Sequence, residues 1–236
     1  MTLPAAVLFD LDGTLIDSEP VWGAAMRALA RSRGVDVSVD LLMRISGLDA
    51  TLAMDFVHRE LGWAGLDIAA DVALQMDRVR EAYLRGLIWR PGAAQLLAAV
   101  RRSGVPTALV TSTYRPLVDV VLSIVGKDNF DVVVCGDDGH ATKPSPAPYL
   151  AAIGALGRPA GTCIAIEDSP RGVASARAAG CVVVQVAPES TGDPHLHVTS
   201  LADASLTNLL SGQGDGPVAA RKRVDAQHAV EMVDLV

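Results

Sequence analysis

Short apolar segments rich in Val, Ile and Ala recur along the chain, and stretches with helical periodicity lie between them. The apolar segments cover residues 5–9, 106–110, 132–134, 162–166 and 181–186. Runs of this length without alternating polar residues are typical of strands buried on both faces of a sheet. Between the runs, apolar residues return at steps of three and four, as in Ala93, Leu96, Leu97 and Val100. Strands that alternate with helices predict an α/β fold with a doubly wound parallel sheet.

The span between the first two apolar segments is much longer than the single helix that a βαβ crossover needs. Helical patterns fill it, at residues 20–33, 39–46, 49–61 and 67–85. We therefore expect an all-helical cap domain at residues 18–89, inserted into a core made of residues 1–17 and 90–211. Residues 212–236 are expected to form a weakly ordered tail whose removal leaves the melting temperature nearly unchanged.

Composition narrows the class of protein. Half of the 236 residues are hydrophobic, which is enough for one substantial core and a small accessory domain. With 20 Lys and Arg against 27 Asp and Glu, the net charge is −7, and no basic run is long enough to bind a nucleic-acid backbone. Charged residues interrupt the longest apolar stretches, and the first residues lack the basic region of a signal peptide. We expect a monomeric cytoplasmic protein that binds neither nucleic acid nor membrane, with Cys135, Cys163 and Cys181 as buried free thiols.

Polar side chains follow four of the predicted strands, at the end of an open α/β sheet where ligands bind. They are Asp10 and Asp12, Thr111 and Ser112, Lys143, and Glu167 and Asp168. Each group has a local explanation, such as a turn, a helix cap or a solvated surface charge. Capping does not require such groups on the loops after four successive strands, so we interpret them as one site.

Four carboxylates at one rim repel each other, and a bound divalent cation relieves that repulsion. Oxygen ligands without His or Cys favour a hard ion, and we expect Mg²⁺. The ammonium of Lys143 fits a phosphate, and Thr111 and Ser112 complete an anion cradle with backbone N–H groups at the start of the next helix. These features predict a magnesium-dependent site for a phosphate ester.

The two aspartates that follow the first strand are two residues apart, so both side chains can approach one phosphorus atom. As nucleophile, Asp10 would form an aspartyl-phosphate and divide hydrolysis into two easier steps. Asp12 would then protonate the leaving oxygen and later deprotonate water.

Four motifs, at residues 10–19, 110–112, 143–146 and 166–172, resemble those of the haloacid dehalogenase superfamily, in its branch with a helical cap after the first strand. That branch includes β-phosphoglucomutase-like enzymes and hexose-phosphate phosphatases. The resemblance implies a Rossmann-like core, with Asp10 as nucleophile and Asp12 as acid/base. It also implies phosphate binding by Thr111 and Lys143, and Mg²⁺ held by Asp10, the carbonyl of Asp12, Glu167 and Asp168.

Within this superfamily the residues favour a phosphatase that acts on a small phosphate monoester, such as a sugar phosphate. A dehalogenase attacks carbon and needs neither Asp12 nor a metal. A phosphonatase needs a cap lysine, and no lysine precedes Lys127. A catalytically silent binding protein on the same fold stays an alternative, although Asp10 and Asp12 are both present.

A phosphomutase is the strongest rival, because it shares the core motifs and differs in its cap. Mutases of this kind carry a cap arginine and a histidine where this chain has Ala50 and Trp22. Arg44 is the cap residue that could still reach a second phosphate. We expect hydrolysis of hexose 6-phosphates or similar esters, without interconversion of glucose 1- and 6-phosphates.

Overall fold

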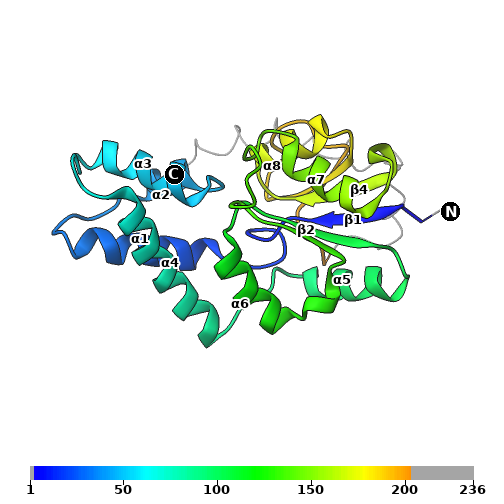
Figure 1. Ribbon diagram of the computed structural model, residues 1–236, viewed down its shortest axis with the longest axis horizontal. Helices are drawn as coiled ribbons and strands as arrows, with labels where there is room; N and C mark the ends of the chain where they lie inside the picture. Colours follow the sequence, from blue (N-terminus) through cyan, green and yellow to red (C-terminus); the bar gives the residue numbers. More distant parts are fainter. Residues whose placement is uncertain (1–2, 203–236) are drawn as a thin grey trace, which may run out of the picture.

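The computed structural model describes residues 3–202, and within them six strands form a single parallel sheet (Figure 1). The order across the sheet is β3-β2-β1-β4-β5-β6. The strands are β1 (Ala6–Phe9), β2 (Thr107–Val110), β3 (Val132–Val134), β4 (Cys163–Glu167), β5 (Val182–Val186) and β6 (Leu196–Val198). The predicted α/β class with a doubly wound parallel sheet is confirmed.

Four helices cover the two faces of this sheet, with short 3₁₀ turns at Lys127–Asn129 and Ala160–Thr162. α5 (Ala93–Arg102) and α6 (Arg115–Val125) lie on one face, and α7 (Ala147–Leu156) and α8 (Pro170–Ala178) lie on the other (Figure 1). Neighbouring strand residues point to opposite faces: Phe9 packs on the α5 and α6 side, and Leu8 packs on the α7 and α8 side. Both faces are therefore apolar, which explains the uninterrupted hydrophobic runs.

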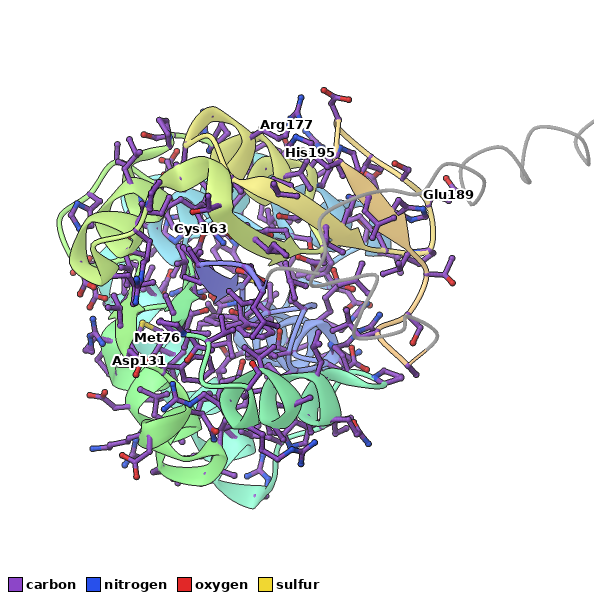
Figure 2. The ribbon with its side chains drawn as sticks, turned by 90° about the vertical axis from the view of Figure 1, so that its right-hand side faces the viewer. Met76, Asp131, Cys163, Arg177, Glu189 and His195 are labelled. Atoms are coloured by element: carbon purple, nitrogen blue, oxygen red, sulfur yellow. The ribbon has the colours of Figure 1, made fainter. Side chains whose placement is uncertain are left out.

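The edge strand β6 is the element that the sequence pattern misses, because a polar segment around His195 and His197 predicts a loop there. The backbone N–H of His195 donates to the carbonyl of Val183, and the Nδ1 atom of His195 accepts the N–H of Val183, both at 2.9 Å. Figure 2 shows His195 beside Arg177, whose guanidinium lies 2.6 Å from the Nε2 atom of His195. The two bonds to Val183 fix the strand to β5, and the bond to Arg177 ties it to α8. The strand is short and polar, so its sequence shows no hydrophobic alternation that would predict it.

The helices α1 (Glu19–Arg31), α2 (Val39–Ile45), α3 (Ala50–Glu60) and α4 (Ile68–Arg85) lie between β1 and α5 in the chain and pack beside the sheet (Figure 1). Each begins and ends within two residues of its predicted position. Side chains of Ser38, Asp49 and Asp67 accept backbone N–H groups in the first turns of α2, α3 and α4, which explains where these helices start. The four helices enclose their own apolar cluster, which includes Met26, Leu29, Met54, Val57 and Trp63.

A buried ionic cluster supports this helical region. The carboxylate of Asp71 on α4 accepts hydrogen bonds from the Nη1 and Nη2 atoms of Arg33 and lies 2.7 Å from the Nε2 atom of His58. The ring of Trp63 lies 4.4 Å from the Arg33 guanidinium and packs edge-on against His58. Burial alone would raise the pKa of Asp71, but the hydrogen bonds from Arg33 and His58 lower it below its usual value.

Two adjacent segments connect the helical region to the sheet. The N–H of Asp17 donates to the carbonyl of Ile88 at 2.7 Å, and the N–H of Arg90 donates to that of Leu15 at 2.9 Å. The predicted division into a cap and a core stays a prediction, and the predicted tail at residues 212–236 lies outside the described residues. The three cysteines are buried and free, as predicted.

No helix in residues 3–202 is long and apolar enough to cross a membrane. The cytoplasmic location and the monomeric state stay predictions.

Candidate active site

A buried ammonium joins two carboxylates at the carboxyl end of the sheet. The Nζ atom of Lys143, on the loop after β3, donates to Asp10 at 2.7 Å, to Glu167 at 2.6 Å and to the carbonyl of Val110 at 2.9 Å. Lys143 is 4% exposed and Glu167 is fully buried. The alternative of a solvated surface charge at Lys143 is therefore wrong.

Asp168 adds a third carboxylate to this group, with ligand oxygens of Asp10, Glu167 and Asp168 all within 4.8 Å of one another. Burial, and then the charge of Glu167, raise the pKa of Asp10 to about 7 in spite of Lys143. Burial and the charge of Asp10 likewise raise the pKa of Asp168 to about 9. One ammonium does not balance three carboxylates, so the group carries excess negative charge that a cation would stabilise.

Two glycines allow the carboxylates to approach the backbone this closely. A Cβ atom on Gly172 would lie 1.9 Å from an oxygen of Glu167. At Gly13, φ is +78° and a Cβ atom would lie 2.0 Å from an oxygen of Asp168. Any larger residue at either position would displace a carboxylate of the site.

The half-buried side chain of Asp12 lies among hydrogen-bond donors from three parts of the chain. The Thr113 hydroxyl donates to Oδ2 at 2.6 Å, and the Thr111 hydroxyl is 3.4 Å from the same atom. From the helical region, the indole N–H of Trp22 lies 3.3 Å from Oδ1, and the hydroxyl of Tyr83 lies 3.4 Å from it. These donors hold the carboxylate of Asp12 in a fixed orientation at the rim.

The sequence reasoning misses most of these partners. Trp22 and Tyr83 are 10 and 71 residues away from Asp12, and Thr113 is 101 residues away. Tyr149 on α7, which donates to Glu167 at 2.6 Å, is missed in the same way. Thr113 is the exception, because it directly follows Thr111 and Ser112, which the sequence already assigns to the site.

The structure around Thr111 and Ser112 differs in one respect from the anion cradle predicted there. Helix α6 begins at Arg115, three residues after Ser112, and its first N–H donates to Asp137 at 2.7 Å. The N–H of Arg115 is therefore engaged, so the start of this helix is not a free anion site. The side chains of Thr111, Ser112 and Lys143 all border the cavity described next.

A cavity of about 260 Å³ lies between the rim and the helical region. Asp10, Asp12, Thr111, Lys143 and Asp168 line its rim side. Glu167 lies behind this surface, where it contacts Lys143 and Tyr149. The opposite wall comes from the four helices and the turn between α2 and α3, and it is mostly apolar, with Trp22, Leu42, Met43, Ile45, Leu48 and Met76 among its residues.

Arg44 does not line this cavity. Its guanidinium lies 2.9 Å from Glu60 and 4.6 Å from the ring centre of Phe56. These contacts hold its charge on the outer side of α2 and α3, so Arg44 is not placed to bind a second phosphate.

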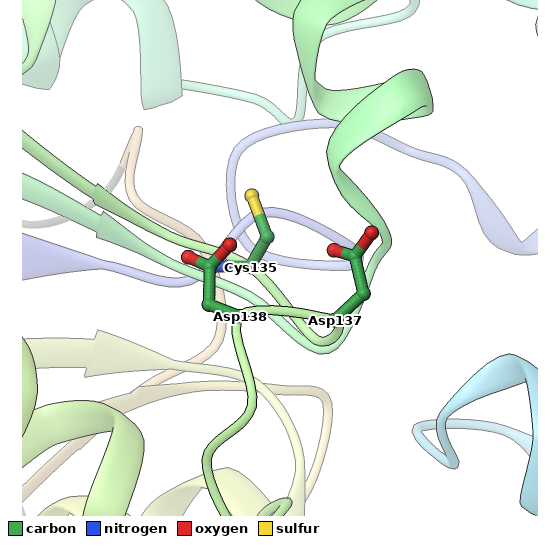
Figure 3. Close-up of side chains that lie close together, drawn as sticks. All are labelled: Cys135, Asp137 and Asp138. Carbon is green, nitrogen blue, oxygen red and sulfur yellow. The ribbon is translucent and has the colours of Figure 1, made fainter.

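A second acidic group, formed by Cys135, Asp137 and Asp138 after β3, has a structural role (Figure 3). Asp137 accepts the N–H of Arg115, and Asp138 accepts the N–H of Cys135 and the Arg115 guanidinium. Burial raises the pKa of the Cys135 thiol to about 12, so the thiol stays neutral. This group therefore holds the loop and the start of α6 rather than a metal.

Known proteins are similar to this chain in sequence and in fold. Residues 4–180 match the haloacid dehalogenase-like hydrolases. Hexitol phosphatase A of Escherichia coli (strain K12) is 34% identical, over 89% of this chain and 96% of its own length. Phosphoglycolate phosphatase of Yersinia pestis is 32% identical, over 74% of this chain and 77% of its own length. A structure of CbbY from Rhodobacter sphaeroides in complex with xylulose-(1,5)bisphosphate superposes with a TM-score of 0.78, at 26% identity, over 88% of this chain and 99% of CbbY. This chain belongs to the haloacid dehalogenase-like hydrolases.

Proposed function

We propose that this protein is a Mg²⁺-dependent phosphatase that hydrolyses a small phosphate monoester, a sugar phosphate or a polyol phosphate, through an aspartyl-phosphate on Asp10. The observation that carries the proposal is the contact of Asp10 with the buried ammonium of Lys143, in a rim with two further carboxylates. Relatives named as phosphatases of hexitol phosphates and phosphoglycolate support the same class of reaction.

The donor set fits a magnesium ion. Asp10, Glu167 and Asp168 bring together oxygen ligands only, and their unbalanced charge favours a hard divalent cation. We assign these three carboxylates and the backbone carbonyl of Asp12 as its ligands. When bound, Mg²⁺ would neutralise charge on the phosphate and on the carboxylates, so that an anionic nucleophile can approach an anionic ester.

In the first step, a carboxylate oxygen of Asp10 attacks phosphorus, and the bond from phosphorus to the ester oxygen breaks. The ammonium of Lys143 stays charged, because Asp10 and Glu167 raise its pKa although burial opposes this. It therefore holds Asp10 in place and attracts the phosphate oxygens. Thr111 and Ser112 border the same space and are assigned to the phosphate as well.

Asp12 is assigned to the proton transfers. Protonated Asp12 gives its proton to the leaving alkoxide, and the ionised carboxylate then takes a proton from the water that attacks the aspartyl-phosphate. Inorganic phosphate leaves and the Asp10 carboxylate is restored. The contacts with Thr113, Trp22 and Tyr83 support both steps, because they orient the carboxylate of Asp12 toward the cavity.

Hydrolysis is favoured over phosphoryl transfer between sugar positions. A mutase must grip the phosphate that points away from the nucleophile, and cationic side chains do this best. Among the described residues that line the cavity, Lys143 is the one cation, and it lies on the rim. Arg44 is held by Glu60 instead.

Phosphate release from p-nitrophenyl phosphate tests the proposal. We expect turnover with Mg²⁺, none in EDTA, and suppression by Ca²⁺, whose larger and looser shell misplaces the nucleophile. Full turnover in chelator would exclude the metal. Assays with β-glucose 1-phosphate and a trace of its bisphosphate test the alternative, because faster formation of glucose 6-phosphate than of free phosphate would identify a mutase.

A further inference from the structure

The wall that the helical region contributes to the cavity is poorly suited to a second anionic group. Its described lining residues include no lysine, arginine or histidine. Its one charged residue is Glu19, which is exposed and accepts the hydroxyl of Ser46 at 2.7 Å. A distal phosphate or carboxylate of a substrate would meet apolar side chains and a negative charge there. The wall therefore favours a substrate whose part beyond the phosphate is uncharged.

Two buried polar residues interrupt this apolar wall: Ser18, at the start of α1, and, on a helix face, Gln75. It is 4% exposed and lies on the buried face of α4, between Val72 and Val79. Gln75 lines the same cavity as Asp10 and Asp12. Within residues 3–202 its side chain makes no hydrogen bond.

A glutamine at this position is not explained by packing. Leu or Met would fill a helix face between two valines without placing an amide among apolar groups, which costs free energy unless the amide finds a partner. A partner that enters the cavity can satisfy both the N–H₂ and the carbonyl of the amide. An alcohol, which both donates and accepts, matches that pair.

We propose that Gln75 is a specificity-determining residue that hydrogen-bonds a hydroxyl of the substrate, and that it selects phosphate esters with an uncharged, hydroxylated carbon chain. This inference rests on the proposed phosphatase function and defines its substrate class. It separates this chain from an enzyme for bisphosphates or phosphocarboxylates, because the wall offers an amide where such substrates need a cation.

The test compares a hexitol 6-phosphate with n-hexyl phosphate, which has the same number of carbons and no free hydroxyl. In Gln75→Met the side chain keeps its length and loses its amide. We expect kcat/KM for the hexitol phosphate to fall about tenfold or more, while kcat/KM for n-hexyl phosphate falls little or rises. The matched control is the same substitution at Gln95, which is exposed on α5 and does not line the cavity. In Gln95→Met the ratio of kcat/KM for the hexitol phosphate to kcat/KM for n-hexyl phosphate should equal that of the wild type. An unchanged ratio in Gln75→Met would overturn the proposal.

Equilibrium binding separates this inference from the proposed function. In the Asp10→Asn background, which does not turn over, the hexitol phosphate should bind about tenfold more weakly when Gln75 is also replaced by Met, and n-hexyl phosphate should not. If the wild type hydrolyses no ester but this difference persists, the phosphatase proposal fails and the role of Gln75 stands. If both ligands lose the same affinity, or if neither binds, the role of Gln75 is refuted.

Discussion

Two buried ionic clusters lie in different parts of this molecule, and their charge balance differs. At the rim of the sheet, the ammonium of Lys143 faces the carboxylates of Asp10, Glu167 and Asp168, and the pKa of Asp10 is raised to about 7. In the helical region, one carboxylate, Asp71, faces the guanidinium of Arg33 and the ring of His58, and its pKa is lowered.

The difference separates a cluster that stabilises the fold from one that is suited to a ligand. In the helical region each charged group meets a partner of opposite sign or a hydrogen bond, so breaking the cluster should cost stability. At the rim, like charges are crowded at a cost in stability, and a cation and a phosphate can relieve it. Equivalent substitutions in the two clusters should therefore have opposite effects.

The largest effect is expected on turnover. Asp10→Asn should lower kcat by more than about 10³-fold, because the amide of asparagine cannot form the aspartyl-phosphate. The melting temperature of the metal-free protein should stay equal or rise, since a carboxylate has been removed from a crowded group. Phosphate release measures kcat, and thermal unfolding measures the melting temperature. Substantial residual turnover would remove Asp10 from the role of nucleophile.

The mirror-image change in the helical region is Asp71→Asn. It leaves Arg33 and His58 without their carboxylate and should lower the free energy of unfolding by about 2–4 kcal/mol. Well below the melting temperature, kcat should stay within a factor of about two. The control is Asp55→Asn, because Asp55 pairs with Arg59 on the exposed side of α3 and such pairs contribute about 0.5 kcal/mol. Equal melting temperatures for the two variants would contradict the structural role of Asp71.

These two clusters also show how far sequence reasoning reaches. The rim residues follow successive strands, so one rule about the ends of parallel strands brings Asp10, Lys143 and Asp168 together. The partners of Asp71 are set by packing between helices, with 13 residues to His58 and 38 to Arg33, and no local pattern joins them. Gln75 is hidden for a related reason. Helical periodicity marks which face of α4 is buried, but it does not show that part of this face borders a cavity.

The pH dependence of stability should differ between the clusters. In the metal-free protein, Asp10 and Asp168 keep protons that the unfolded chain loses near a pH of about 4. Their contribution to stability is complete below that pH and is lost as pH rises through about 7 and about 9. Asp71 has the opposite sign: its contribution is present above a pH of about 4 and is lost as pH falls through its lowered pKa.

Thermal unfolding in EDTA between pH 6 and pH 9, chosen as roughly the range in which the rim titrates, tests this difference. The melting temperature should fall across the range in the wild type and fall less in Asp10→Asn. Mg²⁺ should raise it more at the alkaline end, where the ligands are ionised. A wild-type profile as flat as that of the variant would contradict the excess charge at the rim.

The smallest effect is expected where the helical region contacts the rim, at Trp22. Its indole N–H is 3.3 Å from Asp12, whereas the hydroxyl of Thr113 approaches to 2.6 Å, so Trp22→Phe removes one of the weaker of the four donors on this carboxylate. We expect kcat to fall about two- to fivefold, and by the same factor on a hexitol phosphate and on n-hexyl phosphate. The reason is that the lost hydrogen bond orients Asp12 and does not contact a hydroxyl of the substrate. Trp89→Phe is the control, since the Trp89 side chain makes no hydrogen bond within residues 3–202. A loss confined to the hexitol phosphate would show instead that Trp22 belongs, with Gln75, to the surface that recognises the substrate.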